Sequence, residues 1–223
     1  MISQRSVKAD LKIPLNYMEN LYLTAEEAEI VFSPRVIELK NKAIEKVMLL
    51  MGRLQQALAA WDAATDFPFE EVWLRQGPKI SKGEQYKSLP WVMLDYPRYF
   101  SKTDVFAFRS MFWWGHYFSC TLHLAGTVKK RFEGPLAEAY AQLAVAGFCV
   151  YLPEDDPWEH DFEEGNYQAI GDMCFEDWKR LVSRQSFIKL AKPFGLERWG
   201  EVITDIVEAY ATLLNVLNVK EGS

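Results

Sequence analysis

The sequence contains little cysteine and no recognisable disulfide pattern. Cys120, Cys149 and Cys174 are its only cysteines, and no two have the spacing of a zinc knuckle or a redox motif. Because three is an odd number, we interpret them as reduced thiols in a reducing compartment. The first eight residues also lack the apolar stretch of a secretory signal. We therefore expect a cytoplasmic protein.

Positive charge is outnumbered by negative charge, with 25 lysines and arginines against 31 aspartates and glutamates. The formal net charge is −6, and the lysines and arginines do not cluster beyond Lys129, Lys130 and Arg131. Binding along a phosphate backbone needs a basic patch or stripe. The composition therefore predicts an acidic protein that does not bind nucleic acid.

A convincing membrane segment is also missing. Residues 110–128 contain no Asp, Glu, Lys or Arg, but they include two histidines and place Trp113, Trp114 and Tyr117 near the middle. A spanning helix needs about 20 mostly apolar residues. Its Trp and Tyr side chains prefer the two interfaces. We interpret this stretch as buried core and predict no membrane partner.

Several catalytic signatures are absent. The sequence has no phosphate-binding loop of the type GxxxxGK(S/T) and no dinucleotide-binding GxGxxG. It also lacks the GxSxG elbow of serine hydrolases and the HExxH of zinc proteases. We accordingly predict no cofactor and assign no metal ligands.

Helical signals occupy both ends of the chain. Thr24-Ala25-Glu26-Glu27 has the pattern of a capping box and predicts a short helix over 25–31. Ser33-Pro34 then begins a second helix of about 28 residues, roughly 42 Å long. Its apolar stripe recurs at steps of three and four and consists of Val36, Leu39, Ala43, Val47, Leu50, Leu54, Leu58 and Trp61. The same spacing predicts a last helix from Trp199 to Leu217.

The middle of the chain is rich in residues that favour strands. We predict a hairpin from 72–80 and 86–96 with its turn at 81–84. Residues 105–124 are predicted as β-structure with a bend near Gly115, a continuous helix being the alternative. A helix from Gly134-Pro135, a short strand over 147–152 and a helix from Phe175 to about Ala191 follow.

Helices at the ends and strands in the middle indicate an α+β fold rather than an alternating parallel sheet. We predict a central antiparallel, aromatic-rich sheet with long N-terminal and C-terminal helices packed on it; a mostly α fold is the alternative. No linker or repeat divides the chain. It is therefore treated as one domain over 1–223, with 1–23 as an N-terminal arm.

The candidate catalytic residues are His116, Cys120, His123 and His160. On a helix the first three would share one face and could bind a metal or form a thiol–imidazole pair. On a strand Cys120 and His123 point to opposite faces, and no such site forms. His160 stands in an acidic loop over 153–165, whose carboxylates do not have the spacing of a calcium loop.

The aromatic residues suggest a pocket. Eight tryptophans are many for one domain, and aromatic side chains beside arginine can line an amphipathic cavity. The predicted ligand-binding residues are Trp91, Tyr96, Arg109, Trp113, Trp114, His116 and Tyr117.

The leading hypothesis for function is a non-catalytic binding module. Its aromatic pocket would hold a small apolar or amphipathic ligand, or a partner subunit of a homo-oligomer. The alternative is a metal- or histidine-dependent enzyme that uses His116 as base or ligand. In that scheme His123, His160, Cys120 or Asp95 would assist His116.

Overall fold

The computed structural model describes residues 21–163 and 165–218, so most of the predicted N-terminal arm lies outside the described residues. The chain divides into two compact units, one ending at Ile44 and one beginning at Glu45. The first contains α2 (Ala25–Val31) and the start of α3 (Pro34–Ala64). The predicted capping box is present: the Glu27 N–H donates to Thr24 Oγ1 over 3.2 Å, and the Thr24 N–H donates to Glu27 Oε2 over 2.7 Å. Both N-terminal helices are therefore confirmed.

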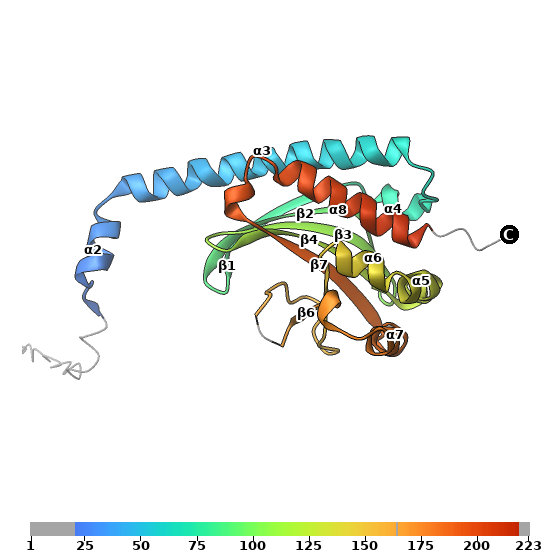
Figure 1. Cartoon of the computed structure of the whole chain (residues 1–223). Coiled ribbons are helices and arrows are strands. Elements are labelled where there is room, and N and C mark those ends of the chain that lie inside the picture. Colours follow the sequence, from blue (N-terminus) through green and yellow to red (C-terminus); the bar gives the residue numbers. More distant parts are fainter. Residues whose placement is uncertain (1–20, 164, 219–223) are drawn as a thin grey trace, which may run out of the picture. The chain divides into compact units, whose positions relative to one another are not determined.

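The second unit is built on an antiparallel sheet. In the described part of the chain its seven strands follow the order β1-β2-β3-β4-β7-β5-β6 (Figure 1). The strands are β1 (Lys79–Tyr86), β2 (Leu89–Phe100), β3 (Val105–Trp113), β4 (Tyr117–Ala125), β5 (Cys149–Tyr151), β6 (Tyr167–Ala169) and β7 (Phe187–Gly195). The α+β prediction with a central antiparallel sheet is confirmed.

The aromatic stretch 105–124 forms the β3–β4 hairpin at the centre of this sheet. Its turn contains Gly115 at φ +75°, a backbone conformation that glycine adopts without steric cost. The predicted bend therefore stands where it was expected. In the described residues no helix combines the length and the apolar character that crossing a membrane requires.

One face of the sheet carries the main core. Phe106 stacks on Trp73 of α4 (Glu71–Arg75), with ring centroids 4.0 Å apart. Phe108 meets Tyr210 of α8 (Val202–Leu217) edge to face at 4.7 Å, and Tyr210 meets Trp61 of α3 at 5.3 Å. In Figure 1 these helices lie on the same side of the sheet. We call this side the helix face.

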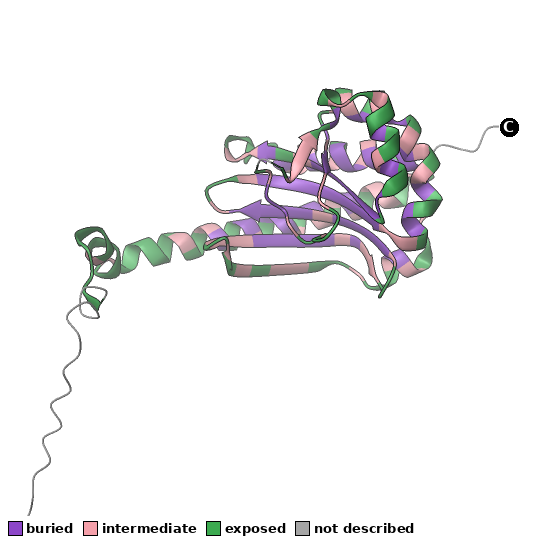
Figure 2. Cartoon of the chain, turned by 90° about the horizontal axis from the view of Figure 1, so that it is seen from below, coloured by how far each residue is buried: buried purple, intermediate pink, exposed green. Residues whose placement is uncertain are grey.

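The opposite face of the sheet is covered only in part. The connection between β5 and β6, residues 152–166, lies across it and is named the acidic loop. The helices α5 (Gly126–Glu138), α6 (Tyr140–Val145) and α7 (Phe175–Arg184) complete the unit. In the view toward this second face most residues of β3 and β4 are coloured as buried (Figure 2). We call this second face the open face.

Three local predictions were wrong. Residues 72–74 belong to helix α4 because Trp73 packs into the core, and the predicted turn 81–84 lies within β1. The hairpin turns instead at Lys87 and Ser88, both at positive φ. The helix predicted to open at Gly134-Pro135 begins at Gly126, where Asp104 from a distant turn accepts the Thr127 N–H at 2.6 Å.

The largest error concerns residues 185–191. They were predicted as the end of a helix, but α7 ends at Arg184 and Phe187–Gly195 form β7. This strand pairs with β4 on one side and β5 on the other. Its apolar residues Phe187, Ile188, Leu190 and Ala191 form a short run broken by Lys189, and periodicity alone does not separate such a run from the continuation of a helix.

Candidate functional site

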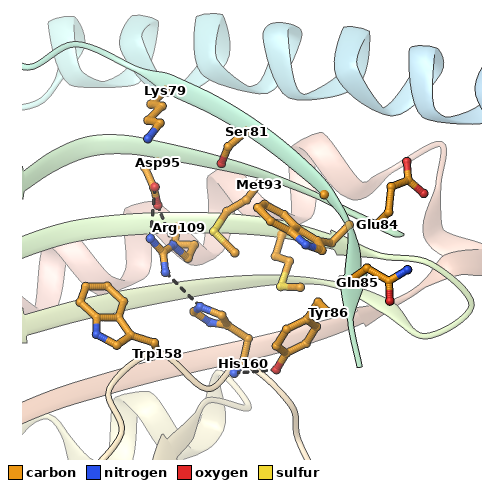
Figure 3. Close-up of a pocket in the computed structure, with 13 residues that line it drawn as sticks. Lys79, Ser81, Glu84, Gln85, Tyr86, Met93, Asp95, Arg109, Trp158 and His160 are labelled. Carbon is orange, nitrogen blue, oxygen red and sulfur yellow. Dashed lines mark hydrogen bonds and ion pairs between the residues drawn. The ribbon is translucent and has the colours of Figure 1, made fainter. Parts of the chain in front are cut away.

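A pocket of about 540 Å³ lies on the open face, between the first three strands and the acidic loop. Figure 3 shows its side chains, which come from β1, β2, β3 and the loop. The lining residues are Lys79, Ser81, Gly83, Glu84, Gln85, Tyr86, Trp91, Met93, Asp95, Arg109, Met111, Trp158 and His160.

Strand register sorts these side chains into rows across the sheet. Asp95 is paired with both Lys79 and Arg109, which makes a polar row. The next row contains Ser81, Met93 and Met111, and the third contains Gly83, Trp91 and Trp113. Because residues two apart on a strand share a face, the pocket changes from polar to aromatic along the strands.

Arg109 is the centre of the polar row. Its Nε and Nη2 donate to the two carboxylate oxygens of Asp95 over 2.6 and 3.1 Å, and its Nη1 donates to His160 Nε2 over 2.9 Å (Figure 3). These bonds use three of the five guanidinium N–H groups, so the other two can donate to a ligand. Its guanidinium carbon also lies 5.7 Å from the centre of the Trp158 ring.

His160 is held as a neutral imidazole. Arginine can only donate, so His160 Nε2 must be the unprotonated nitrogen that accepts. Burial, and then the positive charges of Arg109 and Lys189, put the pKa of His160 well below its ordinary value. The ring is therefore an acceptor at neutral pH.

The apolar rows form a firm floor and wall. Met93, Met111 and Trp113 are buried together, and Trp91 packs against them. A Cβ atom on Gly83 would lie 2.6 Å from Trp91 Nε1. The Trp91 indole is thus seated directly on the β1 backbone, which requires glycine at position 83.

Hydrogen bonds fix the acidic loop to the sheet. Tyr86 donates to the Glu159 carboxylate and accepts the His160 N–H at 3.0 Å. Tyr117 donates to the His160 carbonyl at 3.2 Å and accepts the Phe162 N–H at 3.3 Å. Lys87, in the β1–β2 turn, forms an ion pair with Asp161. These contacts hold His160 in the pocket.

Two further basic side chains lie behind this wall. Lys189 of β7 is buried, with its ammonium nitrogen 4.2 Å from the Tyr151 ring centre and donating to the Glu159 carbonyl. Burial and then Arg109 lower the pKa of Lys189 to about 7. Burial, Lys189 and Arg109 lower the pKa of His123 to about 3, so His123 is neutral at physiological pH.

The predicted ligand-binding residues are divided by the structure. Trp91 and Arg109 line the pocket, Trp113 lies beneath it, and Tyr117 anchors the loop. Two others lie elsewhere. Burial and the nearby Asp62 carboxylate of α3 raise the pKa of Tyr96, and Trp114 meets Phe112, a helix-face residue, at 6.2 Å.

The candidate catalytic residues do not come together. His160 lines the pocket, whereas His116 is exposed in the β3–β4 turn and stacks on Trp113 at 3.6 Å. Cys120 is buried on the helix face, and burial raises its pKa to about 12. His123 is on the other face of β4, as the strand alternative required. Among the described residues no group of three His, Cys, Asp or Glu side chains could hold a metal ion.

The sequence reasoning missed the apolar lining. Met93, Met111 and Tyr86 carried no signal of their own, and Trp158 was grouped only by composition. Register was the signal that could have found the two methionines, because a hairpin that pairs Trp91 with Trp113 also pairs Met93 with Met111.

Comparison with known protein families, curated proteins and solved structures finds no match to this chain. The fold and the site define it as an α+β protein whose antiparallel sheet carries an amphipathic pocket on its open face. Its function must therefore be inferred from the pocket itself.

Proposed function

We propose that this protein is a non-catalytic binding protein that holds a small amphipathic ligand in the open-face pocket. The observation that carries the proposal is the order of the rows, with a fixed arginine at one end and methionine and tryptophan at the other. Small-molecule sites typically combine an apolar lining with a few fixed polar groups in about 300–1,000 Å³. The cysteine content suggests that binding takes place in the cytoplasm.

The polar row supports a ligand with one acidic group. Lys79 and Arg109 both line that end of the pocket, and the Asp95 carboxylate offsets one of their two positive charges. A single carboxylate suits this balance better than a multiply charged phosphate would. The flat or aliphatic body of the ligand would lie over Met93, Met111 and Trp91, where apolar contact stabilises the bound ligand.

The state of His160 supports binding rather than catalysis. A general base needs a free lone pair within hydrogen-bond reach of the substrate proton. The Nε2 lone pair of His160 accepts from Arg109, and its backbone is tied to Tyr86 and Tyr117. The histidine therefore orients the guanidinium that would hold the acid.

Native mass spectrometry of untagged protein tests the proposal through co-purifying small molecules. Ser81→Trp would fill the pocket from β1, whereas Lys82→Trp is the matched control on the opposite side of the same strand. We expect a bound acid in the wild type and in Lys82→Trp, and its loss in Ser81→Trp. Equal retention by Ser81→Trp and Lys82→Trp would contradict binding in this pocket.

A histidine-dependent enzyme is the second candidate, and it is favoured by one observation: a neutral histidine reaches the pocket. The two functions differ in what happens to the ligand. If His160→Gln protein retains a molecule of different mass from the one that the wild type retains, the wild type converts it and the enzyme reading holds. The same molecule in both proteins supports binding alone.

A further inference from the structure

The described part of the N-terminal unit has almost no interior of its own. None of the residues of α2 is buried. A seven-residue helix is too short to be stable in water by its own hydrogen bonds. The capping box satisfies the helix end but covers no apolar side chain. Contacts beyond the described part of this unit must therefore stabilise α2.

Figure 2 colours most of the same segment as exposed, and many of its exposed residues are apolar. Between residues 21 and 39 nine large hydrophobic residues are 44% to 79% exposed: Leu21, Tyr22, Leu23, Ile30, Val31, Phe32, Val36, Ile37 and Leu39. At roughly 100 Å² each they offer about 900 Å². A standard interface buries about 800 Å² on each partner. The area is therefore enough for a stable dimer.

The charges of this segment and of the three residues that follow it are self-complementary. The helix α2 carries Glu26, Glu27 and Glu29, whereas residues 33–44 carry Arg35, Lys40 and Lys42 against Glu38. In a two-fold interface residue i of one copy meets residue j of the other, and j meets i. An antiparallel pair would place the acidic helix of each copy beside the basic segment of the other. A membrane surface is disfavoured, because surface-bound helices carry basic polar faces.

We propose that residues 21–39, named the N-terminal patch, bind the same patch of a second copy of this chain. The pocket of the other unit takes no part, so the dimer and the ligand can be lost separately. The apolar side chains supply the buried area, and the opposite charges set the antiparallel direction.

Multi-angle light scattering of the full chain at about 50 µM tests this proposal, since interfaces of this size bind at micromolar or tighter affinity. We expect a dimer for the wild type and a monomer for the triple variant Ile30→Ser, Phe32→Ser, Val36→Ser. Val145→Ser, at a residue 91% exposed outside the patch, is the matched control and should remain a dimer. A monomeric wild type, or a triple variant with undiminished dimer, would overturn the proposal.

A truncated chain tests whether another segment covers the patch, and charge-reversal variants test whether the two copies pair antiparallel. A chain lacking residues 1–20 should dimerise like the wild type; if only this truncated chain dimerises, residues 1–20 cover the patch and the proposal is wrong. The reversed-charge variants Glu26→Lys/Glu29→Lys and Arg35→Glu/Lys42→Glu should each dimerise weakly and form a mixed dimer when combined. If no mixed dimer forms, the antiparallel pairing is wrong.

Discussion

Arg109 and Asp95 show how a pair of charges is kept on the partly covered open face of the sheet. Their side chains are 14% and 9% exposed, and two hydrogen bonds join them. Removal of one partner leaves the other charge buried without compensation, which costs more than the pair itself contributes. The end of the pocket that we propose to bind an acid thus depends on a carboxylate that would not itself touch the ligand.

Asp95→Ala should lower the free energy of unfolding by about 2–4 kcal/mol. Glu71→Ala is the control, because Glu71 and its partner Arg75 are 86% and 69% exposed, and exposed pairs contribute about 0.5 kcal/mol. Urea denaturation of both variants measures the difference. Equal losses would show that the Arg109–Asp95 pair is not buried as described.

Lys189 makes stability depend on pH. Its pKa is about 7 in the folded protein and about 10.5 in the unfolded chain, so between these values the unfolded chain binds more protons. Stability contributed by this group therefore rises as the pH rises through that window, by up to about 1.4 kcal/mol per unit. Below pH 7 the cost of the buried charge is fully present.

Lys189→Met removes this dependence. Urea denaturation between pH 7 and pH 9 should give a more positive slope of unfolding free energy for the wild type than for the variant. The exposed-lysine variant Lys82→Met should keep the wild-type slope. Identical slopes in all three proteins would mean that Lys189 keeps an ordinary pKa.

At the scale of elements, the acidic loop depends on a few anchors from the strands. Lys87 of the β1–β2 turn pairs with Asp161, while Tyr86 and Tyr117 bond to the loop backbone. The loop therefore closes the pocket only while the hairpin holds it. A variant that cuts one anchor should loosen the wall without unfolding the sheet.

Lys87→Ala should increase hydrogen exchange in residues 159–163 by about fivefold, the effect of losing an ion pair worth about 1 kcal/mol. The amides of β3 and β4 should keep their protection from exchange, because the Lys87–Asp161 ion pair involves neither strand. The control Lys82→Ala should exchange like the wild type. Unchanged exchange in the loop of Lys87→Ala would show that other contacts hold it.

The elements also show what the sequence could and could not predict. The α3 stripe, the capping box at Thr24 and the turn at Gly115 are local signals, and each predicted its element. The strand β7 was missed because its identity comes from pairing with β4 and β5, which are distant in the sequence. Likewise His160 meets Arg109 only through the return of the acidic loop, so the sequence named both residues but not their bond.

At the scale of the molecule, the sheet separates two environments. The helix face is filled with aromatic core, and the open face holds the polar row, the pocket and its loop. An aromatic pocket was predicted on these strands, whereas nine of the thirteen residues that line the open-face pocket are methionine, polar or charged residues. Only strand register decides which residues share a face, because a shift of one residue would exchange the two faces.

Titration with aryl carboxylates and their matched primary amides tests the central claim most directly. With ¹³C-methyl-labelled methionine, each of the seven methionines in the chain gives a probe, and Met93 and Met111 line the pocket. We predict that a carboxylate shifts these two methyl signals and binds about tenfold or more tightly than its amide, an advantage lost in Arg109→Gln. Carboxylate and amide binding equally, or both leaving Met93 and Met111 unshifted, would contradict the account.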